Sequence, residues 1–186
     1  NANVRVSGKG SHRLWSGNPL LPCGERISFM KYTLEVCVDS MASAVSAKNG
    51  GATRLELCQS LITGGITPSV QLFRQVRDIT GLPVIVLIRP RFGDFLYDEY
   101  ELSQMLSEIK MFRDEGAFGV SAGALNPDGS LDERRMEKFS LAAGNMHFVL
   151  NRAFDMVKNP LASFNQLKNL GVNGVLTSGS METAVE

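Results

Sequence analysis

Residues 33–39 read TLEVCVD, and the LEVC motif at 34–37 returns 21 residues later as LELC at 55–58. On a β-strand successive side chains point to opposite faces, so Glu35 and Cys37 share one face, as do Glu56 and Cys58. A parallel strand is buried on both faces and normally consists of apolar residues. Because an unpaired buried charge is costly, we expect the polar faces of these strands to meet inside a closed or curled sheet, together with Arg54.

Outward from this repeat, β-rich runs alternate with longer amphipathic stretches, which is typical of βα units around a parallel sheet. The expected strands are 33–39, 54–58, 84–89, 118–122, 147–151 and 174–177. A TIM-type (β/α)₈ barrel has eight such units in about 250 residues. We therefore predict an α/β fold, a TIM-type barrel truncated to about six βα units. An open doubly wound sheet is the alternative, although no GxGxxG motif follows any of the expected strands.

Two regions follow from this pattern. Residues 1–31 mix Gly, Ser, Asn and Pro and show neither the period of 2 of a strand nor the period of 3.6 of a helix. We therefore expect a mobile N-terminal extension. Residues 32–186 are expected to form the partial barrel, which lacks the last two βα units. Such a sheet would expose unpaired edges at 33–39 and 174–177, which predicts a homo-oligomer.

Composition narrows the class of partner and the compartment. The 186 residues include 19 Lys+Arg and 19 Asp+Glu, so there is no excess of positive charge to attract a nucleic acid. The longest apolar run, residues 83–88, is too short to span a membrane. The three cysteines are an odd number in a chain with no evident signal peptide. This pattern indicates reduced thiols in the cytoplasm, with the nucleus as the alternative.

Polar residues follow the expected strand ends, where barrel enzymes keep their sites. Three arginines there, Arg89, Arg91 and Arg152, suit a small anionic ligand such as a carboxylate or phosphate. The turn at 177–180 could add backbone donors to that anion. In an enzyme acting on such a metabolite, Glu35 or Glu56 could serve as general base. The alternative is that these charges only pair with one another inside the barrel.

Cys37 and Cys58 suggest a metal. If the two motifs pair in register, the sulfur atoms lie about 4.8 Å apart on adjacent strands. Two soft thiolates at that spacing suit Cu(I), whereas zinc usually takes four ligands and the chain has no CxxC or HxxxH motif. The alternative is that both cysteines pack as small buried hydrophobes.

Motifs along residues 33–180 closely resemble the copper homeostasis protein CutC family, in order and at the family's spacing. They are LEVCVDS at 34–40, RLELC at 54–58, GGITPS at 64–69, IRPRFGDF at 88–95, RAFD at 152–155 and LTSG at 176–179. The resemblance implies a TIM-type barrel and copper homeostasis, with Cu(I) bound by Cys37 and Cys58. Where the family has a histidine before RAFD, this chain has Asn151, which removes a metal ligand or proton carrier. Together with Arg91, the pocket candidates are Glu35, Arg54, Glu56, Arg89, Asp94, Arg152 and Asp155.

Three hypotheses therefore stay open. The first is a copper homeostasis protein that binds Cu(I), the second a barrel enzyme acting on a small anionic metabolite, and the third an inactive scaffold.

Overall fold

The computed structural model describes residues 4–7 and 32–180. Its strands form one sheet in the order β1-β2-β3-β4-β5-β6-β7. The six strands from β2 to β7 are parallel to their neighbours, whereas β1 (Val4–Ser7) runs antiparallel to β2. The parallel strands are β2 (Thr33–Val38), β3 (Arg54–Leu57), β4 (Val84–Leu87), β5 (Gly119–Ala122), β6 (His147–Leu150) and β7 (Gly174–Val175).

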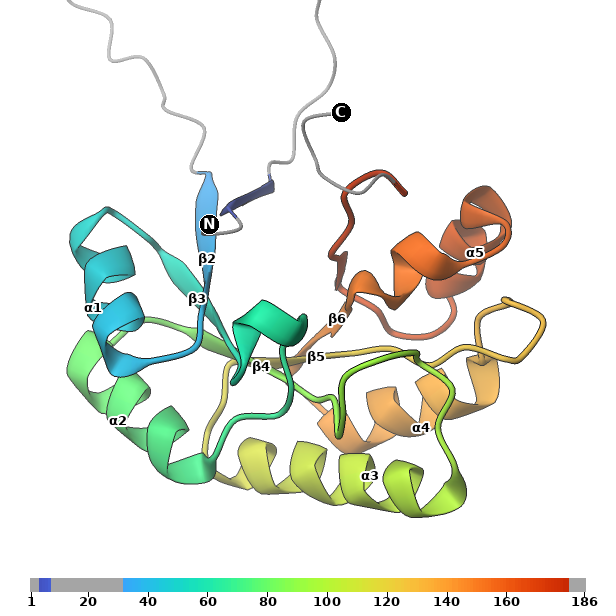
Figure 1. The fold of residues 1–186 in the computed structure, drawn as a ribbon, viewed down its shortest axis with the longest axis horizontal. Helices are drawn as coiled ribbons and strands as arrows, with labels where there is room; N and C mark the ends of the chain where they lie inside the picture. Colours follow the sequence, from blue (N-terminus) through green and yellow to red (C-terminus); the bar gives the residue numbers. More distant parts are fainter. Residues whose placement is uncertain (1–3, 8–31, 181–186) are drawn as a thin grey trace, which may run out of the picture.

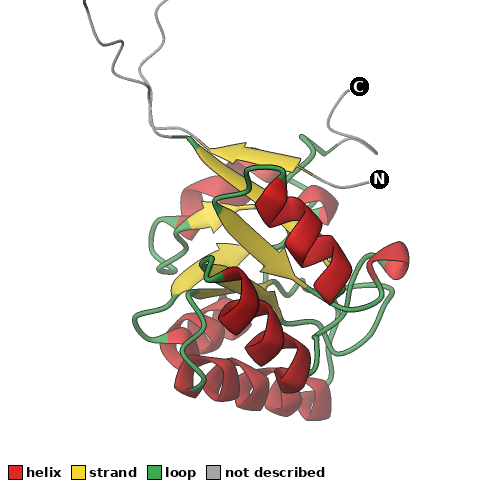
Figure 2. Cartoon of the chain, turned by 90° about the vertical axis from the view of Figure 1, so that its left-hand side faces the viewer, coloured by secondary structure: helices red, strands yellow, loops and turns green. Residues whose placement is uncertain are grey.

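The sheet curls into a half-barrel with the helices around its outer side (Figure 1). Figure 2 shows the helices packed against the strands of the sheet. They are α1 (Met41–Asn49), α2 (Val70–Thr80), α3 (Glu99–Asp114), α4 (Glu133–Ala143) and α5 (Pro160–Leu167). Because strand order follows chain order without a reversal, the prediction of a TIM-type barrel with six βα units is confirmed and the doubly wound alternative is wrong.

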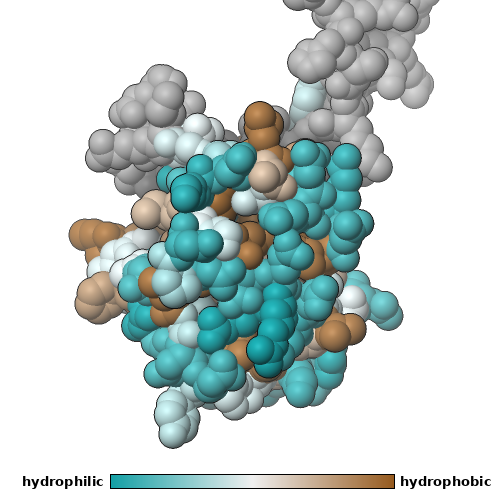
Figure 3. All heavy atoms as spheres, turned by 90° about the vertical axis from the view of Figure 1, so that its right-hand side faces the viewer, coloured by the Kyte–Doolittle hydropathy of each residue, from teal (hydrophilic) through white to brown (hydrophobic). Residues whose placement is uncertain are grey.

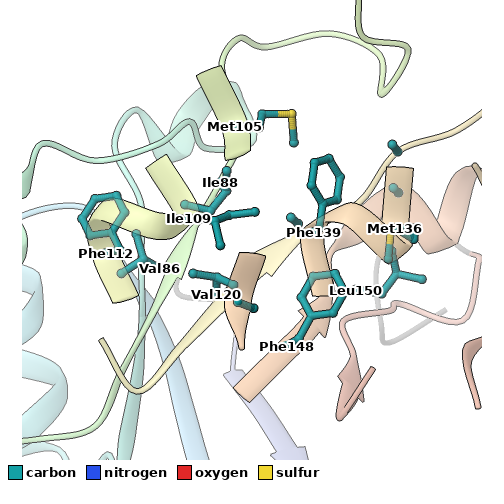
Figure 4. Packing of buried hydrophobic residues seen from close by; sticks show 14 of the residues in the cluster. Val86, Ile88, Met105, Ile109, Phe112, Val120, Met136, Phe139, Phe148 and Leu150 are labelled. Atoms are coloured by element: carbon teal, nitrogen blue, oxygen red, sulfur yellow. The ribbon is translucent and has the colours of Figure 1, made fainter. Parts of the chain in front are cut away.

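The hydrophobic core lies between the outer face of the sheet and the helices. Figure 4 shows side chains of α3 and α4 packed against those of the β4, β5 and β6 region. Alternation along the strands explains this division, because Leu55 and Leu57 belong to the core cluster whereas Glu56 between them does not. Labelled members of the core are Val86, Ile88, Met105, Ile109, Phe112, Val120, Met136, Phe139, Phe148 and Leu150.

One edge of the sheet differs from the prediction. Val4–Ser7 pairs with β2, with Val4 opposite Val36 and Val6 opposite Leu34, so the edge that we expected to be open at 33–39 is covered. This strand falls within the expected mobile extension, and the remainder of that extension lies outside the described residues. A strand at this edge satisfies backbone groups that would otherwise be unpaired.

The surface seen from the α4 and α5 side is mostly hydrophilic, with scattered apolar side chains (Figure 3). Leu141 and Leu161 are among the exposed ones. No helix within residues 4–7 and 32–180 combines the length and the apolar character needed to cross a membrane.

Candidate functional site

A cavity of about 470 Å³ lies on the polar inner side of the half-barrel, at the carboxyl ends of its strands. This volume falls within the range of small-molecule pockets. Cys37 of β2, Glu56 of β3 and Leu87 of β4 contribute to it, together with residues that follow β3, β4, β6 and β7. Its lining residues are Cys37, Glu56, Cys58, Leu61, Thr63, Gly64, Leu87, Arg89, Gly93, Phe95, Asn151, Arg152, Asp155, Met156 and Leu176.

The two cysteines both face this cavity, but their strands do not pair as the repeat suggested. Cys37 lies opposite Glu56, so the two copies of the motif are staggered by two residues. Neighbouring strands of a barrel must be staggered for the sheet to close, and this shear overrides the alignment of the motifs. The two motifs therefore do not pair in register, and Cys37 and Cys58 do not lie directly opposite one another.

The stagger brings a carboxylate to the thiols. Cys37 Sγ donates to Glu56 Oε2 at 3.2 Å, and Cys58 Sγ donates to the Val38 carbonyl at 3.6 Å. Cys37 is half-buried and Cys58 is fully buried, and both are free cysteines. The hydrogen bond with Cys58, burial and the nearby Glu56 together raise the pKa of the Cys37 thiol far above its ordinary value. The Cys37 thiol is therefore protonated at neutral pH when no cation is bound.

Metal sites with several ligands are not present in the described part of the chain. No group of three or more His, Cys, Asp or Glu side chains among residues 4–7 and 32–180 could hold a metal ion. The cavity therefore offers its two thiols without a third His, Cys, Asp or Glu side chain placed to complete a metal site among the described residues.

Arg89 is held in the wall of the cavity by backbone carbonyls. Its Nη1 donates to the carbonyls of Gly64 and Gly65 at 3.3 and 3.2 Å, and its Nη2 donates to the carbonyl of Gly93. The guanidinium also lies 4.7 Å from the ring centroid of Phe95. Gly64 has a φ of +90°, and a Cβ there would approach Arg89 Nη1 to 3.0 Å, so both conformation and space require glycine.

Arg152 and Asp155 form an ion pair beside the cavity. Asp155 also accepts from the Thr177 hydroxyl at 2.5 Å and from the backbone N–H groups of Ser178 and Ser180 at 3.2 and 3.1 Å. Burial raises the pKa of the Asp155 carboxyl, but the hydrogen bonds from this turn and from Arg152 outweigh it and hold the pKa below its ordinary value. These two N–H groups, which we expected to be available for an anionic ligand, are therefore already used.

Four of the pocket candidates lie elsewhere. Arg91 bonds to Asp94 at 3.0 Å and to Glu101, and neither Arg91 nor Asp94 lines the cavity. Glu35 and Arg54 pair with each other but do not line the cavity either. The remaining candidates, Glu56, Arg89, Arg152 and Asp155, are brought together with the two cysteines.

Sequence reasoning did not foresee how the cavity is built. The glycine carbonyls that hold Arg89 carry no side-chain signal, although the adjacent Gly64 and Gly65 indicate an unusual turn. In the sequence, Asn151 stands out only as a departure from the family pattern, whereas in the structure it lines the cavity.

Comparison with known proteins agrees with this architecture. The model of the CutC family matches residues 32–186. The chain belongs to the CutC family. Similar proteins include a CutC family protein of Mesorhizobium japonicum, 43% identical over 153 residues, which are 82% of this chain and 59% of that relative. The human copper homeostasis protein cutC homolog is 41% identical over 166 residues, 89% of this chain and 61% of the relative.

The mouse copper homeostasis protein cutC homolog is 43% identical over 155 residues, 83% of this chain and 57% of the relative. The chain thus spans about three fifths of the length of these curated relatives. Among solved structures, the CutC protein of Streptococcus agalactiae superposes with a TM-score of 0.75 at 28% identity, covering 80% of this chain and 73% of that one. The CutC half-barrel described above is therefore a fold shared with a solved CutC protein.

Proposed function

We propose that this CutC chain takes part in copper homeostasis by binding Cu(I) through Cys37 and Cys58. The proposal is carried by one observation, that two free thiols line the same cavity, one on β2 and the other directly after β3, the strand that pairs with it. The names of the human and mouse relatives support it, because both are called copper homeostasis protein cutC homolog.

The chemistry of the thiols fits a soft cation better than a nucleophilic role. The raised pKa of the Cys37 thiol disfavours the thiolate, which is the form needed both for nucleophilic attack and for metal binding. A cation can displace the proton, whereas a nucleophile would need a base to remove it. Cu(I) prefers sulfur and supplies the positive charge that a buried thiolate needs. Binding therefore replaces thiol protons by the metal ion and should strengthen as the pH rises. Thiols with this task must be kept reduced, which supports a cytoplasmic location.

The experiment is an anaerobic Cu(I) titration of the full chain against a competing chromophoric chelator. The variants are Cys37→Ser, Cys58→Ser and the double variant, with Cys23→Ser, which changes the third cysteine of the chain, as the matched control. We expect the wild type and Cys23→Ser to take up a single tightly bound Cu(I), and the double variant to lose it. Unchanged stoichiometry in a double variant whose circular dichroism matches the wild type would refute the thiol-pair site.

A further inference from the structure

Arg89 carries a buried positive charge without a negative partner. The residue is 7% exposed, and no carboxylate of the described residues forms a salt bridge with it. The neighbouring Tyr97 does not supply the charge, because burial raises the pKa of its hydroxyl to about 12. Carbonyl oxygens and the Phe95 ring hold the guanidinium in place but leave its charge unneutralised. A buried ion in this state is costly unless a counter-ion joins it.

Other arginines of the described chain differ in this respect. Most of them pair with an aspartate or a glutamate, including Arg152, which also lines the cavity. Arg134 forms no salt bridge in the described part of the chain, but it is exposed to solvent, where a charge needs no partner. Arg89, in the cavity wall, is therefore buried without a salt bridge, unlike these other arginines.

Two hydrogen-bond donors in the wall of the cavity are also unsatisfied. Asn151 Nδ2 is buried and has no hydrogen-bond partner among the described residues; Arg89 Nε makes no hydrogen bond of good geometry there, although the Tyr97 hydroxyl lies near the guanidinium. The orientation of the Asn151 amide is fixed, because its Oδ1 accepts from the Ala153 N–H at 2.9 Å, which leaves Nδ2 as the free end. Asn151 is 2% exposed, so bulk water does not replace the missing acceptor. Both residues line the cavity, and the Asn151 amide lacks an acceptor oxygen within the described residues.

The charge and the walls of the cavity indicate which anion fits. One unneutralised guanidinium matches a single negative charge, and the Glu56 carboxylate in the same lining would repel a phosphate dianion more strongly than a monoanion. Apolar walls from Leu61, Leu87, Met156 and Leu176 suit a hydrocarbon body. We propose that the cavity binds a small monocarboxylic acid with an apolar body, whose carboxylate pairs with Arg89 and accepts from Asn151.

This proposal does not rest on copper binding. The carboxylate would use the arginine and the amide, whereas the metal would use the two thiols. Loss of Cu(I) uptake in the cysteine variants would leave the carboxylate site untouched, and the reverse also holds.

The test is isothermal titration calorimetry of the full chain in reductant without copper. The probes are butanoate, 3-methylbutanoate and benzoate, with their uncharged amides and inorganic phosphate as controls. We expect at least one carboxylate to bind, its matched amide to bind at least about tenfold more weakly, and phosphate not to bind. Absence of binding by all three carboxylates, or binding of phosphate alone, would overturn the proposal.

Two variants locate the site. Asn151→Asp keeps the oxygen that accepts from Ala153 but replaces the amide donor by a negative charge, and Arg89→Gln removes the guanidinium. Each should weaken carboxylate binding by about 10- to 100-fold. Arg134→Gln removes the same charge at an exposed position and should leave the affinity unchanged. If Arg89→Gln does not fold, Asn151→Asp decides the matter, and unchanged affinity in that variant would refute the assignment.

Discussion

Asp155 ties the segment after β6 to the turn that follows β7, and Asp155→Asn tests this link. The carboxylate is 6% exposed and accepts hydrogen bonds from the Thr177 hydroxyl and from two backbone N–H groups, while also pairing with Arg152. Asparagine keeps one oxygen but turns an NH₂ group toward donors on the other side. A hydrogen bond to a charged group contributes about 1.5–3 kcal/mol.

The ion pair with the half-exposed Arg152 adds little to the free energy of unfolding, because solvent screens the charge of the arginine. We therefore expect Asp155→Asn to lower the free energy of unfolding at pH 7 by about 2–3 kcal/mol. The pKa of this carboxyl lies below its ordinary value of 3.8 in the folded chain. Its contribution is therefore complete above that ordinary value and is lost as the pH falls through the folded pKa. The difference between wild type and variant should thus narrow below about pH 4.

The measurement is urea unfolding of both proteins at pH 7 and at a series of lower pH values, followed by circular dichroism. Asp128→Asn is the matched control, because Asp128 is exposed and accepts hydrogen bonds from the backbone and the hydroxyl of Ser130 within its own turn. It should change the free energy of unfolding less than Asp155→Asn. A loss at Asp155 that is equally large at the lowest pH would show that the charge does not carry the effect.

Three further outcomes are expected. Gly65→Ala places a Cβ 2.7 Å from a Leu87 methyl group at a φ of +83°, and it should lower the free energy of unfolding in urea by about 2–3 kcal/mol. Gly51→Ala has a similar φ of +94° but open space around the new Cβ, and it should lower that free energy by only about 1 kcal/mol. Phe112→Ala removes a fully buried ring of the core and should lower the free energy of unfolding by about 3–5 kcal/mol, and a loss below about 1 kcal/mol in chemical unfolding would contradict the packing described. Glu35→Gln leaves its partner Arg54, which is partly buried, without a counter-charge and should cost about 3 kcal/mol in the same assay; a neutral result would show that the ion pair does not stabilise the fold.

The strand pattern allowed much of the site to be anticipated. Alternation placed Cys37 and Glu56 on inward faces, and both line the cavity. Loop residues were harder, because the IRPRFGDF motif presents Arg89 and Arg91 alike. The structure turns Arg89 inward to three carbonyl oxygens and Arg91 outward to Glu101, and this choice depends on glycine turns that close only in the folded chain.

The sequence by itself determined the layering of this protein, since the period of two along each strand fixes which side chains share a face and the βα order favours a parallel sheet. Only the tertiary structure decided which inward residues meet. The shear of the curled sheet moved Cys37 opposite Glu56 instead of Cys58. The fold also joined Asp155 to the Ser178 and Ser180 backbone and left Arg89 without a counter-charge. Alternation is a local property of the backbone, whereas register and charge pairing depend on how distant segments close around a common interior.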